Sequence, residues 1–310
     1  MMNQERVWRI GTRGSALALA QAEMTESALR EAFPGILLER VIIKTTGDLR
    51  QDIRLADLSG TIGPDGEIVD KGVFTKELEI ALLRDEIDIA VHSLKDVPTE
   101  VAAAFEIRGV LPRAATEDVV LTREESGRGL GGLPDGACVG TSSVRRAHQL
   151  KRLRSDLRTE EIRGNVPTRI RKLLAGDFDA IVLARAGLER LGYAPMSGEL
   201  VIDGASVCAD VIDEAQIRPA AGQGAVGFEI RQGDADAAAL VDAINDAETW
   251  RRVRCEREFL RLLDAGCETP IGITTKVVGE ALDVAAILFS DDEPPKVATV
   301  NGSGSAEEIA

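Results

Sequence analysis

The chain has 310 residues, enough to bury a large hydrophobic core and to form about two or three domains. Its 44% hydrophobic and 29% charged residues are typical of a soluble globular protein, and no apolar run approaches the length that would span a bilayer. The net charge of −15 disfavours nucleic acid as the main partner, because neutralising phosphates requires a surplus of Lys and Arg. The first residues show no apolar signal-peptide segment, so we expect a cytoplasmic protein.

Strand and helix patterns alternate along most of the chain. Helices are predicted where apolar residues recur every three or four positions, and strands where apolar residues run together. The predicted elements are, in chain order, a strand at 7–10, a helix at 16–29, a helix at 72–85, and strands at 87–92 and 178–184. Alternation of this kind favours an α/β fold with mostly parallel, or mixed, sheets.

Two segments share one plan: a strand, then a hydroxyl-rich turn with arginine, then a helix. The first is "GTRGS" at 11–15, and the second is "GTSSVRR" at 140–146. A helix N-terminus has free backbone N–H groups and a partial positive charge, so each opening suits an anion. The sequence leaves open the plainer interpretation that each is only a capped helix start.

Arginines gather near these openings in an otherwise acidic chain. Residues 140–172 contain ten Lys or Arg and only three acids. A guanidinium donates two parallel hydrogen bonds to a carboxylate or a phosphate, so a small polyanion would account for the arginines in Gly-, Ser- and Thr-rich loops. A solvated helix face explains the lysines equally well. The candidate anion ligands are Arg13, Arg145, Arg146, Arg163, Arg169 and Arg190.

The motif "HSLKDVPTE" at 92–100 places a carboxylate, Asp96, directly after a predicted strand. Active-site groups of open α/β sheets lie at such carboxyl ends of strands. A carboxylate there can stabilise a developing cation and transfer protons. The alternative is that Asp96 only bonds the backbone of the turn, with Lys95 as its surface partner.

From about residue 247 the pattern changes. A long helix is predicted over 248–263, and short strands follow at 273–280 and 282–290. This succession indicates a small α+β domain at the C-terminal end of the chain.

The four cysteines form no C-x-x-C pair, which favours reduced thiols over disulfides. With only two histidines, we expect no zinc site. Cys255 falls on the apolar stripe of its helix, and Cys138 and Cys208 fall in predicted strands, so all three are expected to be core residues. Cys267 instead lies in the loop "DAGCETPIG". Its position there calls for a separate explanation.

Eight motifs occur in a consistent order between residues 11 and 272. They are "GTRGSALALAQ", "KTTGD", "KGVFTKELE", "HSLKDVPT", "GTSSVRRAHQL", "IRGNVPTR", "AAGQGAVG" and "GCETPIG". With them the whole chain resembles the porphobilinogen deaminase, or hydroxymethylbilane synthase, family. It departs from the family pattern at Ala16, where proline is usual, and in a longer, acidic stretch between Leu58 and Lys71.

The resemblance implies an α/β protein of three domains. The first two would be built like type II periplasmic binding proteins, with 1–111 and 225–242 forming a discontinuous domain 1 that carries the catalytic Asp. Residues 117–218 would form an arginine-rich domain 2 that binds anion and cofactor. Domain 3, at 246–310, would be the small α+β domain with the cofactor-attachment cysteine. We expect a monomer that binds neither nucleic acid nor membrane.

The resemblance also implies a cofactor and a reaction. Cys267 would hold a dipyrromethane through a thioether, which explains a lone loop thiol without a partner. Four porphobilinogen molecules would be joined head to tail onto this primer, each losing ammonia, and hydroxymethylbilane would be released by hydrolysis. Asp96 would be catalytic, with Lys95 assisting. The residues implied to bind cofactor or substrate are Arg13, Ser15, Lys71, Ser143, Arg145, Arg146, Arg163, Arg169, Arg190 and Gln223.

Two other functions compete with this one. A non-catalytic two-domain binding protein for a polyanionic small molecule would explain the helix openings and the arginines, but it would not require Asp96 or Cys267. A nucleic-acid binder would rest on the basic segment 140–172. The net charge of −15 and the 3% aromatic content, which leaves few residues for base stacking, oppose it.

Overall fold

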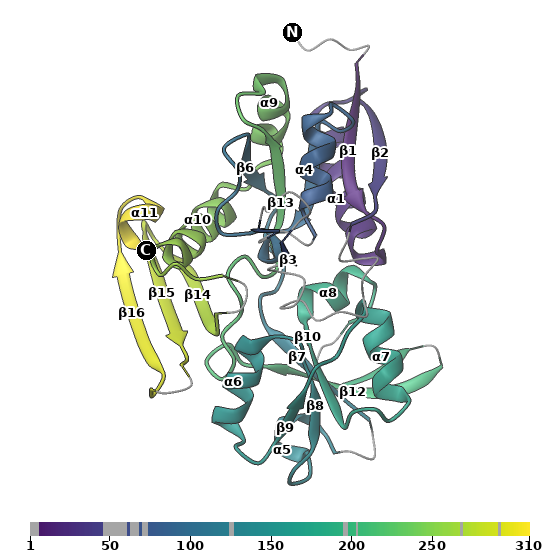
Figure 1. Ribbon diagram of the computed structural model, residues 1–310, viewed down its shortest axis with the longest axis vertical. Coiled ribbons are helices and arrows are strands. Elements are labelled where there is room, and N and C mark those ends of the chain that lie inside the picture. Colours follow the sequence, from purple (N-terminus) through teal and green to yellow (C-terminus); the bar gives the residue numbers. More distant parts are fainter. Residues whose placement is uncertain are drawn as a thin grey trace. The chain divides into compact units, whose positions relative to one another are not determined.

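The structure is a computed structural model of the chain. It describes residues 6–45, 61–62, 68–69, 74–123, 127–194, 198–202, 204–266, 269–290 and 293–310. The chain divides into two compact units, drawn in Figure 1. Unit 1 comprises Met1–Arg113 and Ala225–Arg254, and unit 2 comprises Ala114–Gly224 and Cys255–Ala310.

Unit 1 is built on a five-stranded sheet in the order β2-β1-β5-β13-β6. Strand β1 lies parallel to both β2 and β5, whereas β13, which the chain contributes after an excursion of more than one hundred residues, is antiparallel to β5 and β6. The strands are β1 (Val7–Arg13), β2 (Leu37–Ile43), β5 (Ile89–Ser93), β6 (Phe105–Val110) and β13 (Val226–Arg231). A separate two-stranded ladder joins β3 (Thr61–Ile62) and β4 (Ile68–Val69).

Helices cover both faces of this sheet, and the alternation of side chains along β5 shows how. Ile89 and Val91 face a cluster that includes Leu29 of one helix and Leu240 of another, whereas Ala90 faces Leu78 on the opposite side. A buried strand of a sheet covered on both faces is apolar throughout for this reason. The helices of unit 1 are α1 (Ala16–Ala32), α4 (Lys76–Leu83), the 3-10 helix η1 (Leu94–Asp96) and α9 (Ala235–Ile244).

Unit 2 contains a six-stranded sheet in the order β11-β12-β7-β10-β8-β9. Strand β7 is antiparallel to both neighbours, and β10 is parallel to β8. The strands are β7 (Asp118–Thr122), β8 (Cys138–Gly140), β9 (Arg158–Glu160), β10 (Ala180–Ala184), β11 (Gly198–Ile202) and β12 (Ala205–Ile212). The helices are α5 (Gly129–Gly132), α6 (Val144–Leu153), α7 (Val166–Leu174) and α8 (Arg185–Arg190). Leu150 of α6 packs on one face of the sheet, and Leu173 of α7 packs on the other.

The C-terminal part of unit 2 is a three-stranded antiparallel sheet in the order β14-β15-β16. Its elements are β14 (Ile271–Val278), β15 (Ala281–Leu288), β16 (Lys296–Gly302) and the short helix α11 (Ala306–Ile309). Cys255 lies in helix α10 (Ala247–Leu262), is fully buried, and packs against Ile273 and Val284 of this sheet. The prediction of a core residue is confirmed for Cys255 and for Cys138, which is also buried. It is wrong for Cys208, which is only partly buried because it alternates with the buried residues of β12.

The α/β class is confirmed, and the predicted elements are found with shifted ends. The helix predicted over 72–85 begins only at Lys76, because Phe74 and Thr75 lie in a turn that precedes it. The long helix predicted from 248 is α10, and the two short strands after it form an antiparallel pair. The division into three domains, with a separate domain at 246–310, stays a prediction.

One glycine of unit 2 is held in a conformation that other residues avoid. Gly224 has φ of +84°, and a Cβ atom added to it would lie 2.5 Å from the carbonyl oxygen of Ala114. Its own carbonyl accepts hydrogen bonds from the Ala114 N–H, at 3.1 Å, and from Arg190 Nη2, at 2.7 Å. The close approach of two backbone segments therefore requires a residue without a side chain.

Gly224→Ala is expected to lower the free energy of unfolding by about 3 kcal/mol, since both the positive φ and the backbone clash oppose a Cβ. The matched control is Gly192→Ala. Gly192 has φ of +82° but nothing within 4 Å of the added Cβ, so only the conformational cost, about 1 kcal/mol, is expected. Urea unfolding of both variants measures the difference. Equal losses would show that the clash at Gly224 is relieved at no cost.

Candidate functional site

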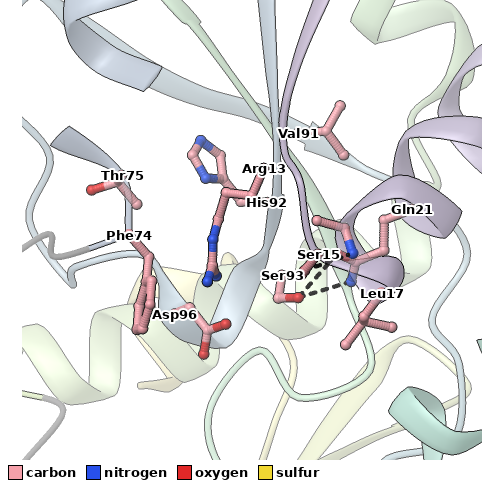
Figure 2. Close-up of a pocket in the computed structure, with 11 residues that line it drawn as sticks. Arg13, Ser15, Leu17, Gln21, Phe74, Thr75, Val91, His92, Ser93 and Asp96 are labelled. Carbon is pink, nitrogen blue, oxygen red and sulfur yellow. Dashed lines mark hydrogen bonds between the residues drawn. The ribbon is translucent and has the colours of Figure 1, made fainter. Parts of the chain in front are cut away.

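A pocket in unit 1 lies where β1 and β5 end. Because these two strands are parallel neighbours, their carboxyl ends meet at the same edge of the sheet. Arg13 ends β1, Ser93 ends β5, and Asp96 closes the 3-10 helix that follows. Figure 2 shows these side chains around the pocket together with Ser15 and Phe74. The structure thus brings three of the predicted site residues, Arg13, Ser15 and Asp96, into one pocket, and Lys95 adjoins Asp96 in the chain.

Local contacts fix two of these side chains. The Arg13 guanidinium lies over the ring of Phe74, 4.0 Å from its centre, in a cation–π contact. Ser15 is the N-cap of α1, where its hydroxyl accepts a hydrogen bond from the Ala18 N–H at 3.3 Å. The first predicted opening is therefore a capped helix start, and the arginine beside it is the feature that also suits an anion.

A buried polar pair lies at the wall of this pocket. His92 Nε2 is 3.0 Å from a carboxylate oxygen of Glu229, and both side chains are almost fully buried. Glu229 also affects Glu79 of helix α4: burial, and then the negative charge of Glu229, raise the pKa of the Glu79 carboxyl. Sequence reasoning did not single out Glu229 or Glu79, because they come from β13 and α4, far apart in the chain.

In unit 2, three predicted ligand residues meet at a carboxylate that the sequence analysis overlooked. Asp118 begins β7 and is fully buried. It accepts hydrogen bonds from Arg145 Nη2 at 2.8 Å, from Arg146 Nε and Nη2 at 3.1 and 2.7 Å, and from Gln223 Nε2 at 2.9 Å. We call Asp118, Arg145, Arg146 and Gln223 the Asp118 cluster.

The charges of this cluster are strongly coupled. Burial alone would raise the pKa of Asp118, but the charges and hydrogen bonds of Arg145 and Arg146 outweigh burial and hold that pKa well below its ordinary value. Burial lowers the pKa of Arg145 more than the Asp118 carboxylate raises it, and the charge of Arg146 lowers it further. The carboxylate therefore stays ionised, and two guanidinium groups share it.

The other predicted ligands of unit 2 are held by local contacts. Ser143 caps α6, accepting from the Arg146 N–H at 3.4 Å, so the second predicted opening is also a capped helix start. Arg163 pairs with Glu161 at 2.7 Å, and Arg169 Nε donates to the Gly164 carbonyl at 2.7 Å. Burial lowers the pKa of Arg190 to about 10.

Three of the predicted ligand arginines keep buried nitrogen atoms that make no hydrogen bond within the described part of the protein. They are Nε of Arg145, Nη2 of Arg163 and Nε of Arg190. A buried N–H without an acceptor costs free energy, so these atoms fit an acceptor supplied by a bound molecule. The residues present therefore suit a ligand that carries several carboxylates.

Two predicted site residues, Lys71 and Cys267, lie outside the described residues. On either side of residues 267–268, Gly266 and Thr269 are joined by two hydrogen bonds: the Gly266 N–H donates to the Thr269 hydroxyl at 3.1 Å and the Thr269 N–H to the Gly266 carbonyl at 3.0 Å. In the described segments, no group of His, Cys, Asp and Glu could hold a metal ion. A search of those same segments finds no helix with the length and apolarity needed to cross a membrane.

These features define an α/β protein in which each unit carries a capped helix start with arginine beside it, which is chemistry that suits a small, acidic ligand. The chain belongs to the porphobilinogen deaminase family. The family model described as "Porphobilinogen deaminase, dipyromethane cofactor binding domain" matches residues 8–239, and the model of the C-terminal domain matches 250–310.

Curated relatives support the assignment over nearly the whole chain. The porphobilinogen deaminase of Syntrophobacter fumaroxidans is 41% identical over 93% of this chain and 86% of the relative. That of Rubrobacter xylanophilus is 44% identical over 91% and 84%, respectively. Among solved structures, the periplasmic VFT2 domain of Bordetella pertussis BvgS is 13% identical with a TM-score of 0.42, covering 77% of this chain and 86% of that one.

The activity follows from the family. The protein is a hydroxymethylbilane synthase, a transferase of tetrapyrrole biosynthesis that acts on porphobilinogen and uses a dipyrromethane cofactor. The predictions of family, activity and cofactor are confirmed, and the non-catalytic binding protein is not supported.

Proposed function

We propose that the unit 1 pocket is the catalytic centre and that Asp96 acts there on the reacting pyrrole. The observation that carries this proposal is the convergence of Asp96, Arg13 and the N-terminus of α1 at the edge where β1 and β5 end. Such an edge is the usual place of the active site in an open α/β sheet.

Asp96 suits the chemistry of ammonia loss. When the amine leaves porphobilinogen, the pyrrole methylene becomes an electron-poor cation, and a nearby carboxylate stabilises developing positive charge. When a pyrrole carbon attacks this cation and the new C–C bond forms, that carbon must lose its proton, and a carboxylate can accept it. Arg13, held over Phe74, would bind a substrate carboxylate, and Lys95, next to Asp96 in the chain, would assist it.

The arginines of unit 2 suit the rest of the ligand. Each pyrrole carries an acetate and a propionate group, so the negative charge grows as units are added. Arg145, Arg146, Arg163, Arg169 and Arg190, with Ser143 and Gln223, would hold these carboxylates, and Lys71 would assist. The buried N–H groups without an acceptor support this role. When bound through Cys267, the dipyrromethane supplies the pyrrole carbon to which the first substrate is joined.

The separate third domain at 246–310, the cytoplasmic location and the monomeric state stay predictions. The match of the C-terminal family model to 250–310 supports the first of them.

Turnover of porphobilinogen by the purified protein tests the proposed function. We expect four molecules of ammonia to be released for each hydroxymethylbilane formed, and we expect Arg13→Gln to raise KM about 10-fold or more, because a charge-assisted hydrogen bond to the substrate is lost. The matched control is Arg30→Gln, which removes a half-exposed arginine of the same unit near the end of α1. Binding without ammonia release would favour the non-catalytic alternative, and an unchanged KM in Arg13→Gln would remove Arg13 from the site.

A further inference from the structure

The Asp118 cluster has a feature that ligand binding by arginine alone does not require. Its carboxylate is 0% exposed and accepts four hydrogen bonds, which is about the full capacity of two carboxylate oxygens. The carboxylate therefore has no hydrogen-bonding capacity left for a ligand. Its contacts serve the arginines.

Both guanidinium groups are fixed at a second point as well. Arg146 Nη1 donates to the carbonyl of Val182 at 3.0 Å, and Arg145 Nη1 donates to the carbonyl of Arg218. Two adjacent cations repel each other, and a shared carboxylate between them offsets that repulsion. With Asp118 on one side and a backbone carbonyl on the other, the plane of each guanidinium is set before any ligand arrives.

The charges of the cluster do not cancel. One carboxylate faces two guanidinium groups, so a single positive charge remains in a buried place. Arg145 Nε is buried and makes no hydrogen bond within the described protein. The surplus charge and the donor without an acceptor both point to an anionic group of the ligand.

We infer that Asp118 is a positioning residue, which orients Arg145 and Arg146 and leaves one unit of positive charge for a ligand carboxylate. The inference rests on the proposed role of these arginines in ligand binding. Asp118 acts through them and touches no reacting atom. Removing it should therefore weaken binding of the substrate carboxylates, which do not react, more than it slows the chemical step.

The test measures KM and kcat for porphobilinogen in Asp118→Asn, with kcat normalised to the fraction of chains that carry the cofactor by intact mass. We expect KM to rise about 10-fold or more and normalised kcat to stay within about 2-fold. The matched control is Asp156→Asn, which breaks an exposed bidentate pair with Arg154, at 2.8 and 2.7 Å, in the same unit. It should change neither value. A lower active fraction with an unchanged KM in Asp118→Asn would mean that the residue is merely structural and would overturn the inference.

A second comparison tests whether Asp118 positions Arg146 even if Asp118→Asn alone does not fold, because the additional change Arg145→Gln removes one of the two cations that would be left without their carboxylate. Arg145→Gln keeps the Asp118 pair with Arg146, whereas the double variant Asp118→Asn with Arg145→Gln has the net charge of the wild-type cluster but no carboxylate. If Asp118 positions Arg146, KM should be about 10-fold higher in the double variant than in Arg145→Gln. An equal or lower KM in the double variant would show that only net charge matters and would overturn the inference. An unchanged KM in Arg145→Gln itself would instead overturn the role proposed for Arg145.

Discussion

Asp96→Asn is expected to lower kcat by about 10²- to 10⁴-fold while the dipyrromethane stays attached to the chain. The amide has nearly the same shape as the carboxylate, so the pocket and its contacts should persist. It has no negative charge to stabilise the pyrrole cation, and it cannot accept the proton that leaves the attacking carbon. The loss should therefore appear in turnover, measured by product formation under saturating porphobilinogen.

The control for Asp96→Asn is Glu100→Gln. Glu100 is exposed, lies four residues further along the same motif, and does not line the pocket. The Glu100→Gln substitution removes the same unit of negative charge from the same region, so a general electrostatic effect would appear in both variants. Intact mass confirms that each variant carries the cofactor. Turnover of Asp96→Asn close to that of wild type would remove Asp96 from the mechanism.

Local sequence signals predicted the parts of the site that depend on neighbouring residues. The sequence predicts a hydroxyl-rich turn at each of two helix openings, and in these turns Ser15 and Ser143 are N-caps that accept a hydrogen bond from a backbone N–H. A capping residue and its helix are adjacent in the chain, so the information is local. The predicted helix begins before α4 does because the spacing of Phe74 and Leu78 is helical, whereas Phe74 lies in a turn and packs against Arg13.

Contacts between distant segments could not be predicted in this way. Arg145 and Arg146 lie 27 and 28 residues after Asp118, and Gln223 lies 105 residues after it. Similarly, 137 residues separate His92 from Glu229. Only the topology of the sheets brings these groups together, and the motif resemblance named the arginines without their shared carboxylate. One signal for Asp118 was present, since an acid that opens the apolar run "DVVLT" is costly to bury unless it is paired.

Loss of the Cys267 thiol is expected to have the other large effect. Wild-type protein, purified and denatured, should exceed the mass of its chain by two linked pyrrole units. Cys267→Ser should lack this excess and should lose turnover by at least about 10³-fold, because a hydroxyl is far less nucleophilic than a thiol and forms no thioether.

The other cysteines provide the controls for this experiment. Burial raises the pKa of Cys138 to about 11, so almost none of it is thiolate near neutral pH, and Cys255 is fully buried in the core beside β14. Cys208 lies half-buried in β12, and Cys208→Ser is the mildest of the three substitutions. It should keep both the added mass and the turnover. If the added mass persisted in Cys267→Ser and disappeared in Cys208→Ser, the attachment point would lie on β12, and the loop thiol would have no part in holding the primer.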